Sequence, residues 1–288
     1  MQGIMQRIEC ALDAYLPSPD SLPAKLHEAM RYATLGGGKR LRALLCHAAG
    51  ELVDADLDLL DGAASAIEMV HAYSLVHDDL PAMDNDLLRR GQPTVHVRYG
   101  EAEAILVGDA LQAQAFVVIG ALPTTTAQRV TLLRELAGAS SSLGLVGGQA
   151  IDLASVGVVL PRHQLERMHR MKTGALLRAA VFMGAYCGPA PLEERMLAAL
   201  DDYQRAVGLA FQVVDDVLDV TTNAATLGKT PGKDAQDHKP TYVSLLGLEA
   251  SRELAEQLGE RARAALAPLG ARATHLHALA DMVVHRIR

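Results

Sequence analysis

The 288-residue sequence contains no tryptophan, three phenylalanines, seven tyrosines and only three cysteines. So few aromatic residues argue against an all-β sandwich, which needs aromatic and β-branched runs between regular turns. Cys10, Cys46 and Cys187 are widely spaced among apolar neighbours. They are typical of reduced packing residues, and they exclude a disulfide framework or a cysteine metal cluster. We therefore expect a cytoplasmic protein.

Positive charge is also scarce. Lys and Arg number 27 against 34 Asp and Glu, a formal net charge of −7. A nucleic-acid binder needs a basic face, so we expect no nucleic-acid partner. Residues 1–16 form an amphipathic pattern rather than a secretory signal. Residues 110–128 are the longest uncharged run, but Gln, Pro and Thr interrupt it, so we expect no membrane span.

Half of the residues are hydrophobic, and most of these are Ala, Leu and Val, which suit closely packed helices. The apolar spacing predicts helices at 1–16, after Pro23, near Lys39, and at 57–76, 101–122, 125–153, 161–187, 191–220, 249–266 and 271–288. No alternating pattern is long enough to predict a strand, and no linker divides the chain. The sequence predicts one all-α domain over residues 1–288, with residues 227–240 as a candidate mobile loop.

Acidic residues inside apolar helices are informative, because a buried carboxylate is unfavourable unless it is paired or bound to a metal. His71, Ser74 and Asp78 are three and four residues apart and share one helix face. Asp84 is out of phase with them. Pro81 should end or bend the helix, however, so that Asp84 returns to the same site.

A second acidic cluster begins at Gln212 and continues through Asp215 and Asp219, again on one helix face. Either cluster alone would equally suit an acidic helix end in solvent. Two such clusters on facing helices form an oxygen-rich site suited to Mg²⁺, which prefers carboxylates, water and substrate phosphate.

Cations accompany both clusters and would supply binding sites for two diphosphates. They are Lys39, Arg42, Arg89, Arg90, Lys172, Lys229, Lys233 and Lys239. Lys39 and Arg42 lie one turn apart at a helix start, where free N–H groups also favour phosphate. We interpret Arg40, between them, as part of a solvated basic turn.

Seven segments occur in the order seen in trans-prenyltransferases. They are GGGKRLR (36–42), HAYSLVHDDLPAMDNDLLRRG (71–91), GGQAIDL (147–153), MKTGALLRAA (171–180), FQVVDDVLDV (211–220), LGKTPGKD (227–234) and KPTY (239–242). The sequence resembles this family, and most closely its bacterial farnesyl diphosphate synthases. The resemblance implies a single-domain bundle of long helices around a central active-site cavity, the isoprenoid synthase type.

The resemblance also implies the reaction. Isopentenyl diphosphate would condense head-to-tail with dimethylallyl or geranyl diphosphate to give all-trans farnesyl diphosphate, with Mg²⁺ (three ions when substrate is bound) and a homodimeric enzyme. Alternatives within the family are geranyl or geranylgeranyl diphosphate synthesis and a non-catalytic subunit, although both aspartate clusters are intact. The scarcity of aromatic residues weighs against a terpene cyclase, which guides a carbocation through several steps.

By resemblance, the metal ligands would be Asp78, Asp79, Asp84, Asp215 and Asp219. The isopentenyl diphosphate site would comprise Gly38, Lys39, Arg42, His71 and Arg90. The allylic diphosphate site would comprise Arg89, Lys172, Thr173, Gln212, Lys229 and Lys239. Lys172, Thr173 and Gln212 would also be catalytic. We leave the roles of Gln149, Asp152, Arg286 and Arg288 open.

Product length should depend on Tyr73 and Ser74. Tyr73 precedes Asp78 by five residues, a rise of roughly 7.5 Å along a helix, so it would obstruct a growing tail soon below the diphosphates. The resemblance favours a C15 product; the less favoured alternative is that Tyr73 is an ordinary core aromatic residue. A different interpretation takes Glu68 with His71, and Glu166 with His169, as the ExxH pairs of a ferritin-like di-iron protein. That interpretation leaves the aspartates and cations unexplained.

Overall fold

The computed structural model describes residues 2–158, 160–221 and 240–287, and nearly all of them are helical. Its elements are α1 (Gln2–Tyr15), α2 (Ala24–Leu35), α3 (Leu41–Glu51), α4 (Leu57–Asp78), β1 (Leu88–Arg89), β2 (Gln92–Pro93), α5 (Val95–Tyr99), α6 (Glu101–Ala121), α7 (Thr126–Ser140), α8 (Leu145–Ala154), α9 (Arg162–His169), η1 (Arg170–Gly174), α10 (Ala175–Tyr186), α11 (Glu194–Thr221), α14 (Tyr242–Leu246), α15 (Leu248–Leu266), η2 (Ala267–Ala273), α16 (Thr274–Val284) and η3 (His285–Ile287). The predicted all-α class is confirmed.

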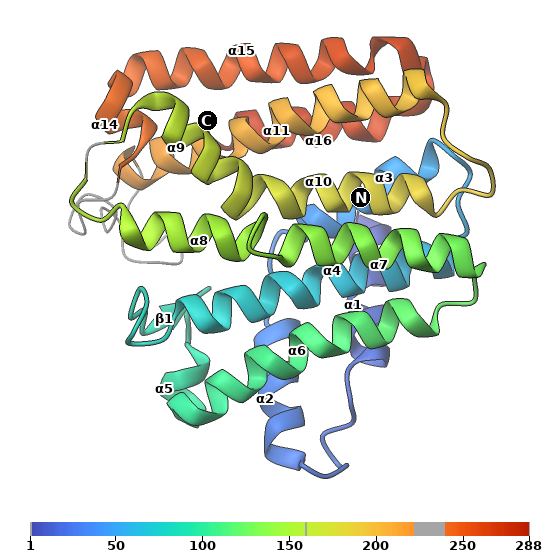
Figure 1. The fold of residues 1–288 in the computed structure, drawn as a ribbon, viewed down its shortest axis with the longest axis vertical. Coiled ribbons are helices and arrows are strands. Elements are labelled where there is room, and N and C mark those ends of the chain that lie inside the picture. The colour runs from blue at the N-terminus through green and yellow to red at the C-terminus, as the bar shows by residue number, and fades with distance from the viewer. Residues whose placement is uncertain (1, 159, 222–239, 288) are drawn as a thin grey trace.

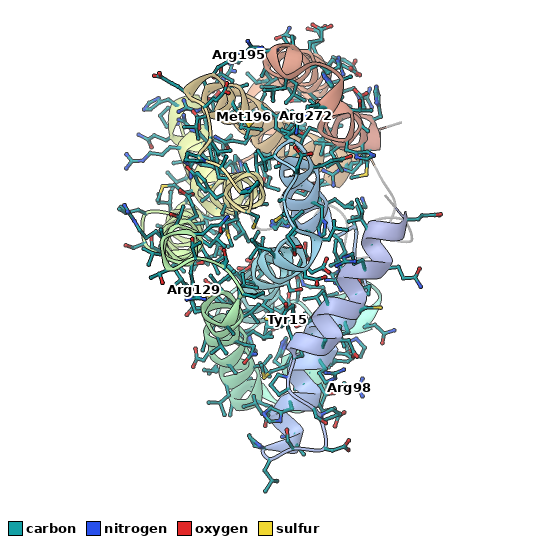
Figure 2. All side chains as sticks on the ribbon, turned by 90° about the vertical axis from the view of Figure 1, so that its right-hand side faces the viewer. Tyr15, Arg98, Arg129, Arg195, Met196 and Arg272 are labelled. Atoms are coloured by element: carbon teal, nitrogen blue, oxygen red, sulfur yellow. The ribbon has the colours of Figure 1, made fainter. Side chains whose placement is uncertain are left out.

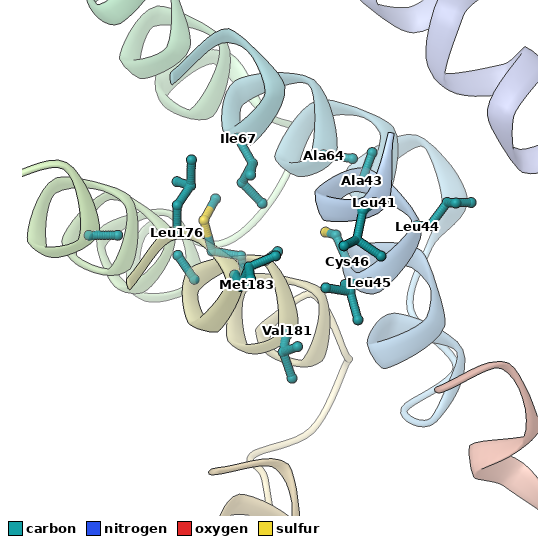
Figure 3. Close-up of a cluster of buried hydrophobic side chains, with 14 of the residues drawn as sticks. Leu41, Ala43, Leu44, Leu45, Cys46, Ala64, Ile67, Leu176, Val181 and Met183 are labelled. Atoms are coloured by element: carbon teal, nitrogen blue, oxygen red, sulfur yellow. The ribbon is translucent and has the colours of Figure 1, made fainter. Parts of the chain in front are cut away.

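Small residues let the central helices pack closely. In the core between α3, α4 and α10, Leu41, Ile67 and Met183 interdigitate with alanines (Figure 3). Gly184 of α10 lies against the backbone of Cys46 so tightly that a Cβ atom there would collide with it. Cys46 and Cys187 are buried free thiols, as the sequence predicts, whereas Cys10 is an exposed free thiol rather than a packing residue.

The helices are long and run roughly side by side (Figure 1). α4 packs between α3 and α6, and α11 packs against α15. The side view places α1 on one face and α6 with α7 on the other. In that view Arg195, Met196 and Arg272 gather at one end of the molecule, Arg98 lies near the other, and Tyr15 lies between them (Figure 2).

Three predicted features differ from the structure. The helix predicted over 125–153 is two helices, α7 and α8, separated near Gly144. The helix predicted over 161–187 contains a π-helical turn, η1, which includes Lys172 and Thr173. A two-stranded hairpin, β1 with β2, follows the first aspartate cluster. It pairs only two residues per strand, which is too short for an alternating pattern to reveal.

α6 is long and apolar enough to span a membrane by length and composition. In the fold it packs against α4, α2, α5 and α7 through Val107, Leu111 and Val118. We therefore interpret α6 as a core helix with one apolar face left exposed.

Candidate active site

A cavity of about 400 Å³ lies where α4, α8, η1 and α11 come together. The C-terminal ends of α4, α8 and α11 lie on the left side of Figure 1, the side that also carries the hairpin. The lining includes carboxylates and amides (Asp78, Asp84, Asp86, Asp152, Gln212, Asp215, Asp216), cations (Arg42, Arg89, Arg90, Lys172), and His71, His169 and Thr173. The cavity therefore brings together most of the side chains that the sequence analysis selected.

The chain bends within the first aspartate cluster, as predicted. α4 ends at Asp78, and the backbone N–H of Asp84 donates to the Asp78 carbonyl over 2.9 Å. The loop that begins at Pro81 thus returns Asp84 to the cavity. Gln149 of α8 donates to the Asp78 carboxylate, so one predicted metal ligand is already oriented by a neighbouring helix.

Asp79 takes a different position. It is buried, and both of its oxygens accept hydrogen bonds from Arg89 at 2.5–2.9 Å. Burial raises its pKa, against the opposing effect of Arg89. Asp79 does not line the cavity. The geometry therefore favours a role in holding Arg89 over the predicted role as a metal ligand.

On the opposite wall, Gln212 and Asp215 of α11 face the cavity. The Gln212 amide donates to Asp216 over 2.8 Å, and Thr173 donates to the Gln212 carbonyl oxygen over 3.4 Å. The other Asp216 oxygen accepts from the backbone N–H of Tyr242 over 2.7 Å. Asp216, to which the sequence assigned no role, thus orients the side-chain amide of Gln212.

The other α11 aspartates lie in different surroundings. Arg286, near the chain end, donates to Asp215 over 2.9 Å and lies 4.2 Å above the centre of the Phe211 ring. The role of Arg286, left open by the sequence, is thus a contact with a cavity carboxylate. Asp219 is buried one turn further along α11 and does not line the cavity, so its metal role stays a prediction.

The predicted isopentenyl diphosphate residues lie together. Arg90 donates to the Gly37 carbonyl, and a Cβ at Gly38 would collide with the Arg90 guanidinium. Burial and the charges of Arg42 and Arg90 lower the pKa of His71 well below its ordinary value, so His71 is neutral at pH 7. Exposed Lys39 does not line the cavity, although Arg286 and Asp215 are close enough to influence its pKa.

Lys172 meets carboxylates from two helices. Its ammonium lies 2.6 Å from Asp152 of α8 and 3.8 Å from Asp78 of α4. Gly148 makes this approach possible, because a Cβ there would collide with the Lys172 backbone. Gln149 and Asp152, whose roles the sequence left open, therefore orient Asp78 and Lys172.

Arg40 is not a solvated basic residue, contrary to the sequence-based interpretation. Its side chain is 2% exposed and pairs with Glu9 and Glu68. The interpretation failed because Arg40 adopts a left-handed conformation, with φ at 48°, that turns the side chain inward. A positive φ at a non-glycine residue carries no clear sequence signal.

Tyr73 is buried on α4 and does not line the cavity. Burial raises its pKa, and Gln112 of α6 partly offsets this effect. Ser74 donates to the carbonyl of His71 over 2.8 Å. The role of Tyr73 and Ser74 in product length stays a prediction.

The donor set fits Mg²⁺. Among the described residues, no three His, Cys, Asp or Glu side chains are grouped closely enough to hold a metal by themselves. Mg²⁺ is usually held by one or two carboxylates together with substrate phosphates and water, which is what facing aspartates across a cavity provide. The ExxH residues do not support a di-iron centre, because Glu68 pairs with Arg40 and Glu166 pairs with Arg162. Lys229, Lys233, Lys239, Arg288 and most of the 227–240 segment lie outside the described residues.

Comparison with known proteins agrees with this geometry. A family model described as polyprenyl synthetase matches residues 23–268. A probable farnesyl diphosphate synthase from Sinorhizobium fredii is 55% identical over 96% of this chain and 84% of its own. The structure of an FPP/GFPP synthase from Zymomonas mobilis is 40% identical, with a TM-score of 0.88 over 98% of this chain and 96% of that one.

A geranyltransferase from Helicobacter pylori, solved in complex with magnesium and isoprenyl diphosphate, is 31% identical, with a TM-score of 0.87 over 99% of this chain and 95% of that one. These likenesses and the helical architecture define an isoprenoid synthase fold. The chain belongs to the polyprenyl synthetase family.

Proposed function

We propose that this protein is a Mg²⁺-dependent prenyltransferase that condenses isopentenyl diphosphate with dimethylallyl and then geranyl diphosphate to give all-trans farnesyl diphosphate. One observation carries the proposal. A single cavity contains aspartates on two facing walls, from α4 and α11, with a set of cations between them. The likeness to the Sinorhizobium fredii protein, a probable farnesyl diphosphate synthase, supports the same reaction.

Two groups of side chains would bind the two diphosphates. Arg89 and Lys172, with Lys229 and Lys239, would bind the allylic diphosphate. Lys39, Arg42, Arg90 and neutral His71, beside Gly38, would bind isopentenyl diphosphate. The Nε of Arg42 is buried without a hydrogen-bond partner among the described residues, and this is consistent with a guanidinium that binds an anion.

Asp78 and Asp84 would hold Mg²⁺ from one wall and Asp215 from the other, with three ions in the loaded enzyme. Bound Mg²⁺ supplies neutralisation of the charge that develops on the departing diphosphate. Asp219 and Asp79 are weaker candidates, since neither lines the cavity. Arg286, now paired with Asp215, would have to share that carboxylate.

The side chains would act by position and charge. As the allylic C–O bond breaks, Arg89 and Lys172 would stabilise the leaving diphosphate, while Thr173 and Gln212 lie beside the reacting carbon and its oxygen. The double bond of isopentenyl diphosphate, held by the Arg42 group, attacks the allylic carbon. A proton then leaves the new chain, with the released diphosphate as the base.

We further propose a homodimer in the cytoplasm, with residues 1–288 acting as one domain. The exposed face of α6 supports the dimer, because Ile105, Leu106 and Val117 are 48–60% exposed there, and Val130 of α7 continues the surface. Exposed apolar residues gathered on neighbouring helices are typical of an interface.

The test incubates purified protein with Mg²⁺, labelled isopentenyl diphosphate and either dimethylallyl or geranyl diphosphate, and measures product mass after dephosphorylation. We expect a C15 alcohol from both starters and no product in the presence of a chelator. A C20 product would keep the reaction but change the product assignment. Absence of elongation with both substrates bound would indicate a non-catalytic subunit and contradict the proposal.

A further inference from the structure

Arg40 immediately precedes α3, with its guanidinium buried among groups from three other helices. Its Nε and Nη2 donate to the two carboxylate oxygens of Glu9 in α1, at 2.6 and 3.1 Å. Its Nη2 also donates to the carbonyl of Thr34 in α2 over 2.7 Å, and its Nη1 donates to Glu68 of α4 over 3.3 Å. We call Glu9, Arg40, Glu68 and the Thr34 carbonyl the Arg40 network.

Glu68 extends this network to the backbone of α3. Its side chain is 3% exposed, and the oxygen not facing Arg40 accepts a hydrogen bond from the Ala43 N–H over 3.1 Å. That N–H is one of the free donors at the start of the helix. Glu68 therefore fixes α3 to α4 one turn before His71, a cavity residue.

The neighbours of Arg40 in the chain are the proposed diphosphate ligands. Lys39 precedes it, Arg42 lies two residues beyond it and lines the cavity, and Gly37 accepts from Arg90. Arg40 is buried whereas the adjacent Lys39 is exposed, so the two side chains lie on different sides of the chain. The contacts of the Arg40 network set the position at which α3 begins, and so the direction of Arg42.

We propose that Arg40 is a positioning residue for the isopentenyl diphosphate site, acting through Glu9 and Glu68 rather than by touching substrate. This inference rests on the function proposed above. The Arg40 network joins α1, α2 and α4 around residues 36–42, so that Arg42 and Arg90 already line the cavity before the diphosphate binds. Preorganised ligands of this kind lower the entropy lost on binding.

Charge balance gives the network a second effect. Glu68 is buried and lies near both Arg40 and Arg42, and its charge raises the pKa of each against the lowering effect of burial. With Arg40 removed, the cations left near the buried Glu68 carboxylate are Arg42 and Arg90. Arg42 would then be drawn away from the cavity, because an unpaired buried charge is strongly unfavourable.

The test compares Arg40→Gln with the unsubstituted protein, using the full chain and steady-state kinetics for both substrates. We expect KM for isopentenyl diphosphate to rise about tenfold, while KM for geranyl diphosphate and kcat change less than about twofold, the pattern of lost binding at one subsite. Arg40→Lys should lie between the two proteins, since lysine keeps the charge but cannot form the two-pronged contact with Glu9.

Arg40→Gln combined with Glu68→Gln separates the two effects. If Glu68 draws Arg42 away, the double variant should recover part of the affinity lost in the single one. The matched control is Arg31→Gln, because Arg31 also ties α2 to α1, through Asp13, but lies outside the cavity. We expect Arg31→Gln to leave both KM values unchanged.

Thermal unfolding and calorimetric binding of isopentenyl diphosphate are measured on every variant. Equal rises in both KM values that follow a loss of thermal stability would assign Arg40 a purely structural role. Unchanged KM values would also overturn the inference. If Arg40→Gln fails to fold, Arg40→Lys and Glu9→Gln provide the same comparison, since Glu9 is 38% exposed. Absence of turnover by the unsubstituted protein would instead count against the proposed function.

Discussion

Two adjacent aspartates at the end of α4 lie in different surroundings. Asp78 faces the cavity beside Gln149 and Lys172, whereas Asp79 is buried and held by Arg89. Spacing predicts the direction of Asp78, because it shares a helix face with His71. Spacing does not predict that Asp79 is buried against Arg89, because the short hairpin that carries Arg89 has no recognisable sequence pattern. The second carboxylate therefore orients an arginine, and the first faces the cavity, where we propose that it holds Mg²⁺.

His169 gives the clearest residue-scale prediction. It is buried at the end of α9, stacks on Tyr242 at 5.7 Å between ring centres, and has no hydrogen-bond partner for either nitrogen among the described residues. Burial lowers its pKa to about 4 from an ordinary value of 6.5. The unfolded chain therefore binds a proton in the interval between these values, and the folded protein does not.

His169 makes folding more favourable above pH 6.5, and this contribution is lost as the pH falls from 6.5 towards 4, by about 3 kcal/mol in total. His169→Phe keeps the stacked ring and should flatten this part of the stability profile, measured by urea unfolding between pH 4 and 8. His163, exposed on the same helix, is the control position. An unchanged slope in His169→Phe would contradict this expectation.

At the scale of elements, the sequence predicts long regular helices well and their interruptions poorly. The predicted 57–76 and 101–122 helices differ from α4 and α6 by two residues or fewer at each end. Apolar periodicity marks such segments because their faces are buried against neighbours. The π turn at Lys172 lies in close contact with Gly148 of α8, and Gly144, at the break, lies against the backbone of Gly138 and Ala139 at the end of α7. Spacing within one segment cannot reveal such contacts.

Tyr73 provides an element-scale prediction about the face of α4 that meets α6. If this ring limits the growing chain, Tyr73→Ala should give products longer than C15, detected by mass after dephosphorylation. The substitution should also reduce stability by about 3 kcal/mol, because a large buried ring is removed. Tyr73→Phe, which keeps the ring, is the control and should retain C15. Unchanged C15 output from Tyr73→Ala would exclude this role.

For the whole molecule, the scarcity of aromatic residues correctly argues against an all-β fold, and paired acidic clusters indicate the cavity. What the sequence leaves unassigned is the support around the cavity. Arg40, Asp152 and Asp216 act through contacts with residues far away in the chain. Their partners become visible only when the helices are assembled, because helical spacing reports the direction of a side chain but not its neighbour.

The last prediction concerns assembly. α6 and α7 lie on the face opposite α1 (Figures 1 and 2). In a single chain, α6 exposes an apolar stripe, Ile105, Leu106 and Val117, to water. If this stripe forms the dimer, Leu106→Lys should produce monomers at micromolar concentration, because pairing would bury a charge at the interface. Leu57→Lys is the matched control, since Leu57 is 54% exposed and Leu106 is 53% exposed. Light scattering coupled to gel filtration measures both masses. A Leu106→Lys protein with the mass of two chains would place the interface elsewhere, and a monomeric unsubstituted protein would contradict the homodimer itself.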